Sequence, residues 1–370
     1  SIDRSNLILG PEDPDIAVRS TSRGPVNFRR TSFAPHIGAP GSTILSAGSG
    51  TGDGVQIIGG TSMAAPHVAG AAALLMEKWP NWTPTQIQTR LMNSGLANVS
   101  DGNGNLYGPQ SVGTGRIDVL AAASNPVIAY HRDDPSGMSV SFGVFEGMVN
   151  GSDPSSVSDE SPTEGGTSQV VTGDGLPPNQ RVITLQNFGN TAATYNTALL
   201  QRTDVPGFSY SVSPATVTVP ANGTADVIVT ISGDGRVAGV NTPNDPTRPT
   251  PSSVQVHMTE ETAIVEFSNN SKGDTLRVPV YAYARPAADM RADGDLSITP
   301  GFGALQIPLT GDGIDTGDGP ANIRSKVMGF TSIEADHPND PTISDYNDIK
   351  SVGISDASFT RAGMLFFAIE

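Results

Sequence analysis

The sequence predicts an α/β segment followed by all-β sandwich domains, and three observations support this. Helix and strand signals mix up to about residue 122, whereas short strand-like runs separated by Gly, Pro, Asp and Asn clusters follow. The 42 glycines and 29 prolines are spread along the chain, which indicates many turns. A length of 370 residues exceeds what one hydrophobic core usually serves, so we expect several domains.

Two helices are predicted in the first segment, residues 1–122. Residues 62–78 are apolar or small on nearly every face, which predicts a buried helix. The second helix opens with Thr83 as N-cap, Pro84 at the first helical position and Gln86 three residues after the cap. These residues are typical of a helix start, so the second helix is expected to begin just after Thr83.

The middle segment, residues 123–288, is predicted to be an antiparallel β-sandwich packed separately from the first. Every second residue is apolar in three runs, which is typical of half-buried strands: Met138–Val144, Val217–Val219 and Val227–Ile231. Residues 151–175 are rich in Ser, Asp, Gly, Pro and Thr and are predicted to be a mobile surface insertion.

Residues 285–288 are predicted to be a linker, because Arg-Pro-Ala-Ala breaks the strand pattern. Residues 289–370 are predicted to be a further β domain that this chain includes only in part. Its expected strands are residues 305–309, 350–354 and 365–369.

Charge and composition exclude several partner classes. The formal net charge is −16, and such a surface repels nucleic acid and anionic lipid. Cysteine is absent, so the chain has no disulfide, thiolate nucleophile or cysteine metal site. No run of about 18 apolar residues occurs, so no transmembrane segment is predicted.

The strongest functional signal is a serine at the first turn of the first predicted helix, preceded by glycine: Gly60-Thr61-Ser62-Met63-Ala64-Ala65-Pro66. A serine hydroxyl is a poor nucleophile unless a base takes its proton. A helix N-terminus offers unpaired amides and partial positive charge to a developing oxyanion. An isolated serine at a helix start is usually only an N-cap, but the residues around Ser62 favour a nucleophile.

This motif resembles the serine motif of the subtilisin-like serine proteases. The resemblance continues, in order along the chain, through residues 22–25, 38–47, 80–83 and 113–119. It implies that residues 1–122 are the C-terminal part of a three-layer, subtilisin-like peptidase domain. The middle segment, with its turn at Pro220–Gly223, resembles the fibronectin type III-like domains that follow such domains.

The resemblance implies a role for each residue of the motif. Ser62 would attack the scissile carbonyl and form an acyl-enzyme, and its own backbone N–H would help to hold the oxyanion. Gly60, Thr61, Met63 and Pro66 would support the motif without taking part in the chemistry.

The remaining catalytic groups of this family are not found in the chain. The family order is Asp, His, Ser, yet neither an Asp-Ser/Thr-Gly nor a His-Gly-x-x-His pattern occurs before Ser62. The oxyanion asparagine is also expected upstream of Ser1. We therefore expect this chain to be part of a longer protein and to be inactive by itself.

Two histidines near the motif, His67 and His36, are candidates for the missing catalytic base. His67 lies five residues along the helix from Ser62, a rotation of roughly 140°, so we expect it to be structural. His36 stands where the family usually has an aspartate, which we interpret as a tolerated loop change. Nothing in the spacing supports a new triad of His36, Asp53 and Ser62.

No cofactor is expected, and the signals for calcium are weak. Asp101–Asn105 resembles the start of an EF-hand loop, but Leu106 and Val112 occupy the glycine and bidentate-acid positions. A polar turn is the better interpretation. Residues 311–319 form an acidic run that leaves calcium open, although such runs are more often solvated turns.

Two hypotheses about function follow. The favoured one is a secreted or cell-surface serine endopeptidase that hydrolyses peptide bonds in proteins or peptides. The alternative is a non-catalytic adhesion or scaffold protein with a degenerate protease shell. The intact motif from Gly60 to Pro66 favours the peptidase.

Overall fold

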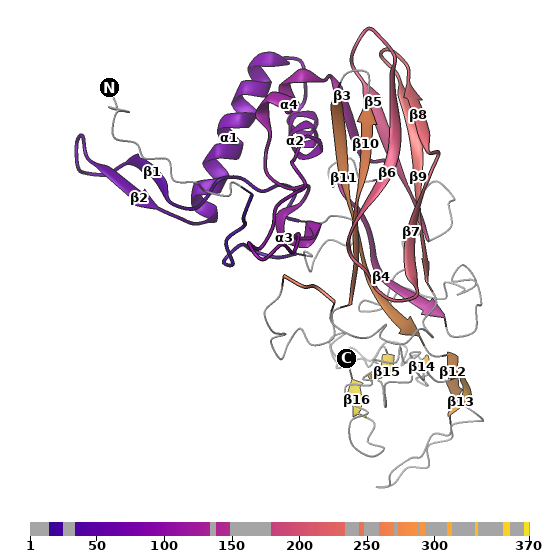
Figure 1. Cartoon of the computed structure of the whole chain (residues 1–370). Helices are drawn as coiled ribbons and strands as arrows, with labels where there is room; N and C mark the ends of the chain where they lie inside the picture. Colours follow the sequence, from indigo (N-terminus) through magenta and orange to yellow (C-terminus); the bar gives the residue numbers. More distant parts are fainter. Residues whose placement is uncertain are drawn as a thin grey trace, which may run out of the picture.

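The computed structural model combines a helical part with a pair of long β-sheets (Figure 1). It describes residues 15–24, 34–133, 138–148, 179–233, 244–247, 259–269, 273–287, 289–292, 309–312, 330–331, 351–355 and 366–369. The predicted mobile insertion, residues 151–175, lies outside these ranges.

The first part contains a hairpin and four helices. β1 (Ile44–Ala47) pairs with β2 (Val55–Ile58), and α1 (Thr61–Lys78), α2 (Pro84–Asn93), α3 (Pro109–Val112) and α4 (Val119–Ser124) follow. The predicted start of α2 is confirmed. The Thr83 hydroxyl accepts from Gln86 N at 3.3 Å, and the Gln86 side chain accepts from Thr83 N at 2.8 Å.

Helix α1 is buried on one face and exposed on the other. Ala71 and Leu75 are its buried residues, and they pack against Ile87 and Leu91 of α2. The side of α1 away from α2 and α4 includes apolar residues that remain exposed. Within the described residues α1 is covered on one side, because α2 and α4, the helices that pack on it, lie there (Figure 1).

The strands between residues 127 and 287 form two sheets that face each other. One has the order β4 (Val140–Met148), β11 (Asp274–Ala287), β10 (Glu260–Asn269), β6 (Ala193–Thr203) and β8 (Thr216–Val219). The other has the order β3 (Val127–His131), β5 (Gln180–Asn187), β9 (Thr224–Gly233) and β7 (Phe208–Ser213). All neighbours are antiparallel except β4, which runs parallel to β11, so the prediction of a wholly antiparallel sandwich was wrong at this edge.

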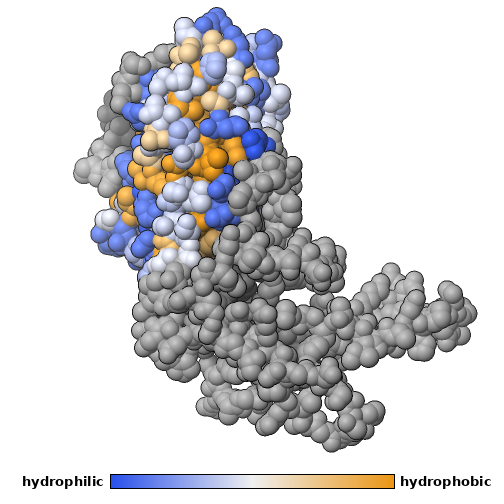
Figure 2. Space-filling view, turned by 90° about the vertical axis from the view of Figure 1, so that its right-hand side faces the viewer, coloured by the Kyte–Doolittle hydropathy of each residue, from blue (hydrophilic) through white to orange (hydrophobic). Residues whose placement is uncertain are grey.

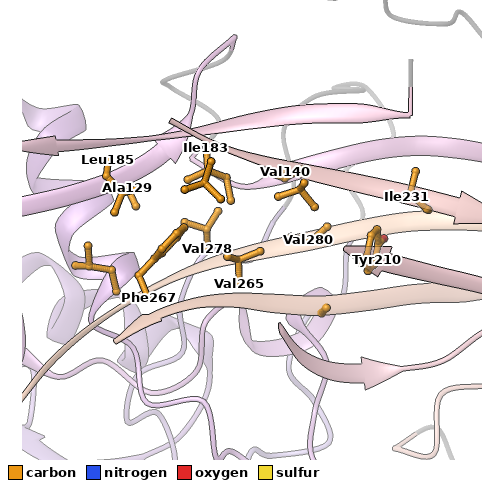
Figure 3. Packing of buried hydrophobic residues seen from close by; sticks show 14 of the residues in the cluster. Ala129, Val140, Ile183, Leu185, Tyr210, Ile231, Val265, Phe267, Val278 and Val280 are labelled. Atoms are coloured by element: carbon orange, nitrogen blue, oxygen red, sulfur yellow. The ribbon is translucent and has the colours of Figure 1, made fainter. Parts of the chain in front are cut away.

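An apolar core lies between the two sheets (Figure 3). Ile183 and Leu185 of β5 belong to the same cluster as Phe267 of β10 and Val278 of β11. The residues predicted from the period-two pattern of the third run are confirmed as buried: Val227, Val229 and Ile231. Burying each such side chain stabilises the fold by about 1.5–3 kcal/mol. On the face with the outer strands β7 and β8, apolar side chains form a band between polar ones (Figure 2).

The prediction of a linker at residues 285–288 was wrong for residues 285–287, which the structure describes. Strand β11 continues through Arg285–Ala287, which pair with Glu146–Met148 of β4. The neighbouring strand holds this stretch extended, an influence that is not visible in the local sequence.

Short strands follow the two large sheets. β12 (Asp289–Ala292) pairs with β13 (Leu309–Asp312), and β15 (Ser351–Ser355) pairs with both β14 (Phe330–Thr331) and β16 (Phe366–Ile369). Two of the three strands expected here correspond to β15 and β16. Most of the third, residues 305–309, lies outside the described ranges.

The helical part and the sheets have separate apolar clusters, but buried polar side chains join them directly. Asn93, at the end of α2, is completely buried. Its Oδ1 accepts from Ala129 N at 2.8 Å, and its Nδ2 donates to Ala129 O and to Arg277 O, both at 2.9 Å. One amide thus bonds to β3 of one sheet and to β11 of the other.

Arg90 of α2 forms a second polar connection in the same interface. Its guanidinium donates to Ala122 O at 3.0 Å, Ala121 O at 2.5 Å and Val127 O at 3.3 Å. It also lies 3.4 Å from Asp274 of β11. Burial lowers the pKa of Arg90, and Asp274 opposes this shift, so the ion pair compensates part of the cost of burying the charge.

Candidate active site around Ser62

Helix α1 starts in a tight contact between two loops. Gly60 is its N-cap, with φ of 147°, and its N–H donates to Gly41 O at 2.7 Å. A Cβ atom on Gly41 would lie 2.8 Å from Gly60 O, closer than such contacts normally are. Glycine at both positions therefore allows the loop before β1 to lie against the start of α1.

Ser62 is the second residue of α1, and its side chain is exposed. Met63 N and Ala64 N both donate to Gly60 O, at 3.0 and 3.3 Å. The N–H groups of Thr61 and Ser62 therefore have no partner within the helix. The first turn holds no acidic residue, so nothing in it offsets the partial positive charge of the helix N-terminus.

Pro66 and His67 follow one turn later in α1. Pro66 has no N–H to give to the Ser62 carbonyl, which a residue at this helix position would otherwise do. The His67 Nδ1 donates to Met63 O at 2.8 Å, so its ring is held by its own helix. The structural role expected for His67 agrees with this bond.

His36 lies against α2 and the glycine-rich segment that follows α3. Its Nδ1 is 3.3 Å from Gln88 Nε2, and its carbonyl accepts from Thr114 N at 3.1 Å. In the described part of the chain, no hydrogen bond or ion pair joins His36 or Asp53 to Ser62. The structure thus offers no support for a triad built from these residues.

His36 should make the fold sensitive to acid. Burial lowers its pKa below the ordinary value near 6.5, and its buried Nε2 has no partner among the described residues. The unfolded chain then takes up the proton first, so stability from neutral His36 is present above pH 6.5 and is lost as the pH falls below it. We expect His36→Gln to reduce the loss of unfolding free energy between pH 7.5 and 5.5 in urea titrations. The exposed His67→Gln is the control, and an unchanged pH dependence in His36→Gln would contradict the prediction.

The candidate calcium loop is a polar turn held by its own side chains. Asp101 Oδ1 accepts from Asn103 N at 2.7 Å and from Asn105 N at 3.2 Å. The Asn105 side chain also donates to Asp101 Oδ2 at 3.0 Å. This bond is the largest cause of the lowered pKa of Asp101, and the two backbone bonds add to it. Within the described ranges no group of three or more His, Asp or Glu residues could hold a metal ion. Most of the acidic run at residues 311–319 lies outside those ranges.

Arg23 is an interface residue that sequence reasoning missed. It belongs to the Ser-Arg-Gly-Pro run at residues 22–25, and it forms ion pairs with Asp245 and Glu260. Its side chain also donates to Ser111 Oγ at 3.0 Å. Glu260 lies 237 positions along the chain, so no local pattern could have paired them.

The sequence around this helix start is similar to a known family. Residues 12–115 match the model of the Subtilase family. We call residues 12–115, which match this model, the subtilase segment. The chain is 35% identical to the Arabidopsis thaliana protein "Subtilisin-like protease SBT4.13" over 139 residues, which are 35% of this chain and 19% of that protein. It is 44% identical to "Subtilisin-like protease SBT2.6" of the same plant over 101 residues, 24% of this chain and 12% of that protein.

The subtilase match is confined to the first part of the chain. Overall, the chain spans about a fifth or less of the length of these relatives. Among solved structures, a FixG-related protein from Vibrio parahaemolyticus is similar at 13% identity and a TM-score of 0.19. That likeness covers 32% of this chain and 89% of that protein, and at so low a TM-score it supports no fold assignment.

The residues predicted around the nucleophile lie together at one helix end of the subtilase segment. Gly60, Thr61, Ser62 and Met63 are consecutive at the start of α1, and Pro66 lies one turn further. Apolar residues towards the other end of α1 and on β2 are exposed. Among the exposed residues are Leu74 and Met76 of α1, at 58% and 55%, and Val55 and Ile57 of β2, at 66% and 62%.

Proposed function

We propose that the complete protein is a serine endopeptidase in which Ser62 is the nucleophile. The observation that carries the proposal is an exposed serine in a subtilase segment, at a helix start where two backbone N–H groups are free of intrahelical partners. In the proposed reaction, Ser62 Oγ bonds to the scissile carbonyl carbon as a base takes its proton. The amine leaves with a proton, and water then hydrolyses the acyl-enzyme.

The base, the carboxylate that orients it and the oxyanion asparagine are assigned to the part of the complete protein that this chain lacks. His67 bonds to its own helix, and His36 lies against α2. The exposed apolar residues of α1 and β2 support the same assignment, because a larger domain would cover them. We therefore propose that the isolated chain is inactive.

Proteins or peptides are the proposed substrates, and the proposed location is outside the cell or at its surface. The match to the Subtilase family model supports the proposed substrates, and this match together with the net negative charge of the chain supports the proposed location. In the part of the chain that the structure describes, no helix has the length and apolar character needed to cross a bilayer.

A fluorophosphonate probe that labels activated serines tests the proposal. The complete protein should be labelled, and mass spectrometry should locate the label on Ser62, whereas the 370-residue chain alone should remain unlabelled. Ser46→Ala, a change in β1, is the control and should leave labelling unchanged. Absence of label on the complete, folded protein would favour the adhesion or scaffold alternative, and labelling of the short chain would contradict its proposed inactivity.

A further inference from the structure

Two adjacent glutamates near the start of β10 are buried, and the proposed reaction uses neither. Glu260 is 1% exposed and Glu261 is 0% exposed. Because successive side chains of a strand point to opposite faces, Glu260 faces the helical part and Glu261 faces the space between the sheets. Their partners agree with this arrangement.

On the outer face, Glu260 holds the subtilase segment. It forms an ion pair with Arg23, which also pairs with Asp245. Tyr281 OH of β11 lies 3.4 Å from Glu260 Oε1. The side chains of Asp245 and Glu260 are 4% and 1% exposed, so this contact is shielded from water.

On the inner face, Glu261 holds the turn between β6 and β7. Gln201 Nε2 donates to its Oε1 at 2.5 Å, and Val205 N donates to its Oε2 at 2.7 Å. Burial raises the pKa of Glu261 to about 7, and the nearby charge of Asp204 adds to this, while the bonds from Val205 and Gln201 oppose it. Among the described residues, Tyr210 of β7 is a further titratable group beside Glu261. Its hydroxyl donates to the backbone carbonyl of Glu261 at 2.8 Å, and burial raises its pKa.

Asn244 connects the two faces. Its Nδ2 donates to Asp204 O at 2.8 Å and to Glu260 O at 2.9 Å. Its Oδ1 accepts from Glu260 N at 3.0 Å. Since Asn244 adjoins Asp245, a movement of the turn at Asp204 would displace a residue that pairs with Arg23.

We propose that Glu261 couples the protonation state of the β-sheet part to the docking of residues 15–24 of the subtilase segment. When Glu261 is neutral, the carboxyl group stays buried and the turn at residues 204–207 remains closed. When it ionises, opening of the turn hydrates the charge, Asn244 loses its bond to Asp204, and Arg23 is held less firmly. Docking is therefore tight in mild acid and looser at alkaline pH.

The direction follows from proton linkage. A carboxyl whose pKa is raised in the closed state binds a proton more tightly there than in the open state. Its stabilisation of the closed state is complete below the ordinary pKa of 4.5 and is lost as the pH rises to about 7. The shift corresponds to a change on the order of 100-fold in the opening equilibrium.

Amide hydrogen exchange of the full 370-residue chain between pH 5 and 8.5 tests the coupling, after correction for the intrinsic pH dependence of exchange. Protection of Val205 and of residues 15–24 should fall together, by on the order of 100-fold, as the pH rises. Glu261→Gln, which cannot ionise, should remove this dependence in both places. Glu266→Gln on the same strand is the matched control and should behave like the parent.

Three results would overturn the proposal. One is protection in residues 15–24 that does not change with pH while that of Val205 does. Another is a pH dependence that persists in a folded Glu261→Gln variant. The third needs no variant: ¹³C NMR of the Glu261 carboxyl in the parent chain should show a midpoint near 7, and a midpoint near 4.5 would remove the basis of the coupling.

Discussion

Ser62→Ala should abolish peptidase activity in the complete protein, with kcat falling by about 10⁶, a magnitude already known from subtilisin itself. Without the hydroxyl no acyl-enzyme forms, while the surfaces that bind substrate remain, so KM should change little. The measurement is steady-state hydrolysis of a fluorogenic peptide library, with Ser46→Ala as control. Activity within a few fold of the parent would show that another residue is the nucleophile.

Arg90→Ala should cost about 3–5 kcal/mol of unfolding free energy, because it leaves a buried charge and several carbonyls without their partner. Among the described side chains, Asp274 would keep Tyr195, whose hydroxyl lies 3.3 Å from its Oδ2. The carbonyl of Ala122 in α4 would lose the Arg90 bond, whereas that of Ala121 would keep the bond from the Ser124 hydroxyl. Urea unfolding of the full chain, followed by circular dichroism, measures the loss.

Arg132→Ala is the matched control for Arg90→Ala. Arg132 pairs with Asp226 at 3.0 Å, but both side chains are well exposed, at 36% and 46%. Solvent screens such a pair, so its removal should cost no more than about 1 kcal/mol. If Arg90→Ala cost as little as Arg132→Ala, the interface between the helices and the sheets would not contribute to stability as the geometry indicates.

The N-terminal ends of α1 and α2 could be predicted from the sequence, because the residues that form them are neighbours in the chain. The N-cap bond of Thr83 and the contact of Gly60 with the first turn of α1 span four residues or fewer. The alternation in Val227–Ile231 likewise reports which face of one strand is buried. The proposed role of Ser62 rests on the motif and on its position at a helix start.

The sequence alone determined the capped helix α2, the glycine-supported serine at the start of α1 and the buried faces of individual strands, because local bonds and side-chain periodicity specify them. Only the tertiary structure decided the partners of those elements. It showed α1 covered on one side, β4 parallel to β11, a strand in place of a linker, and Arg23 paired with Glu260. Each depends on contacts between residues far apart in the chain, and such contacts leave no periodic trace in the sequence.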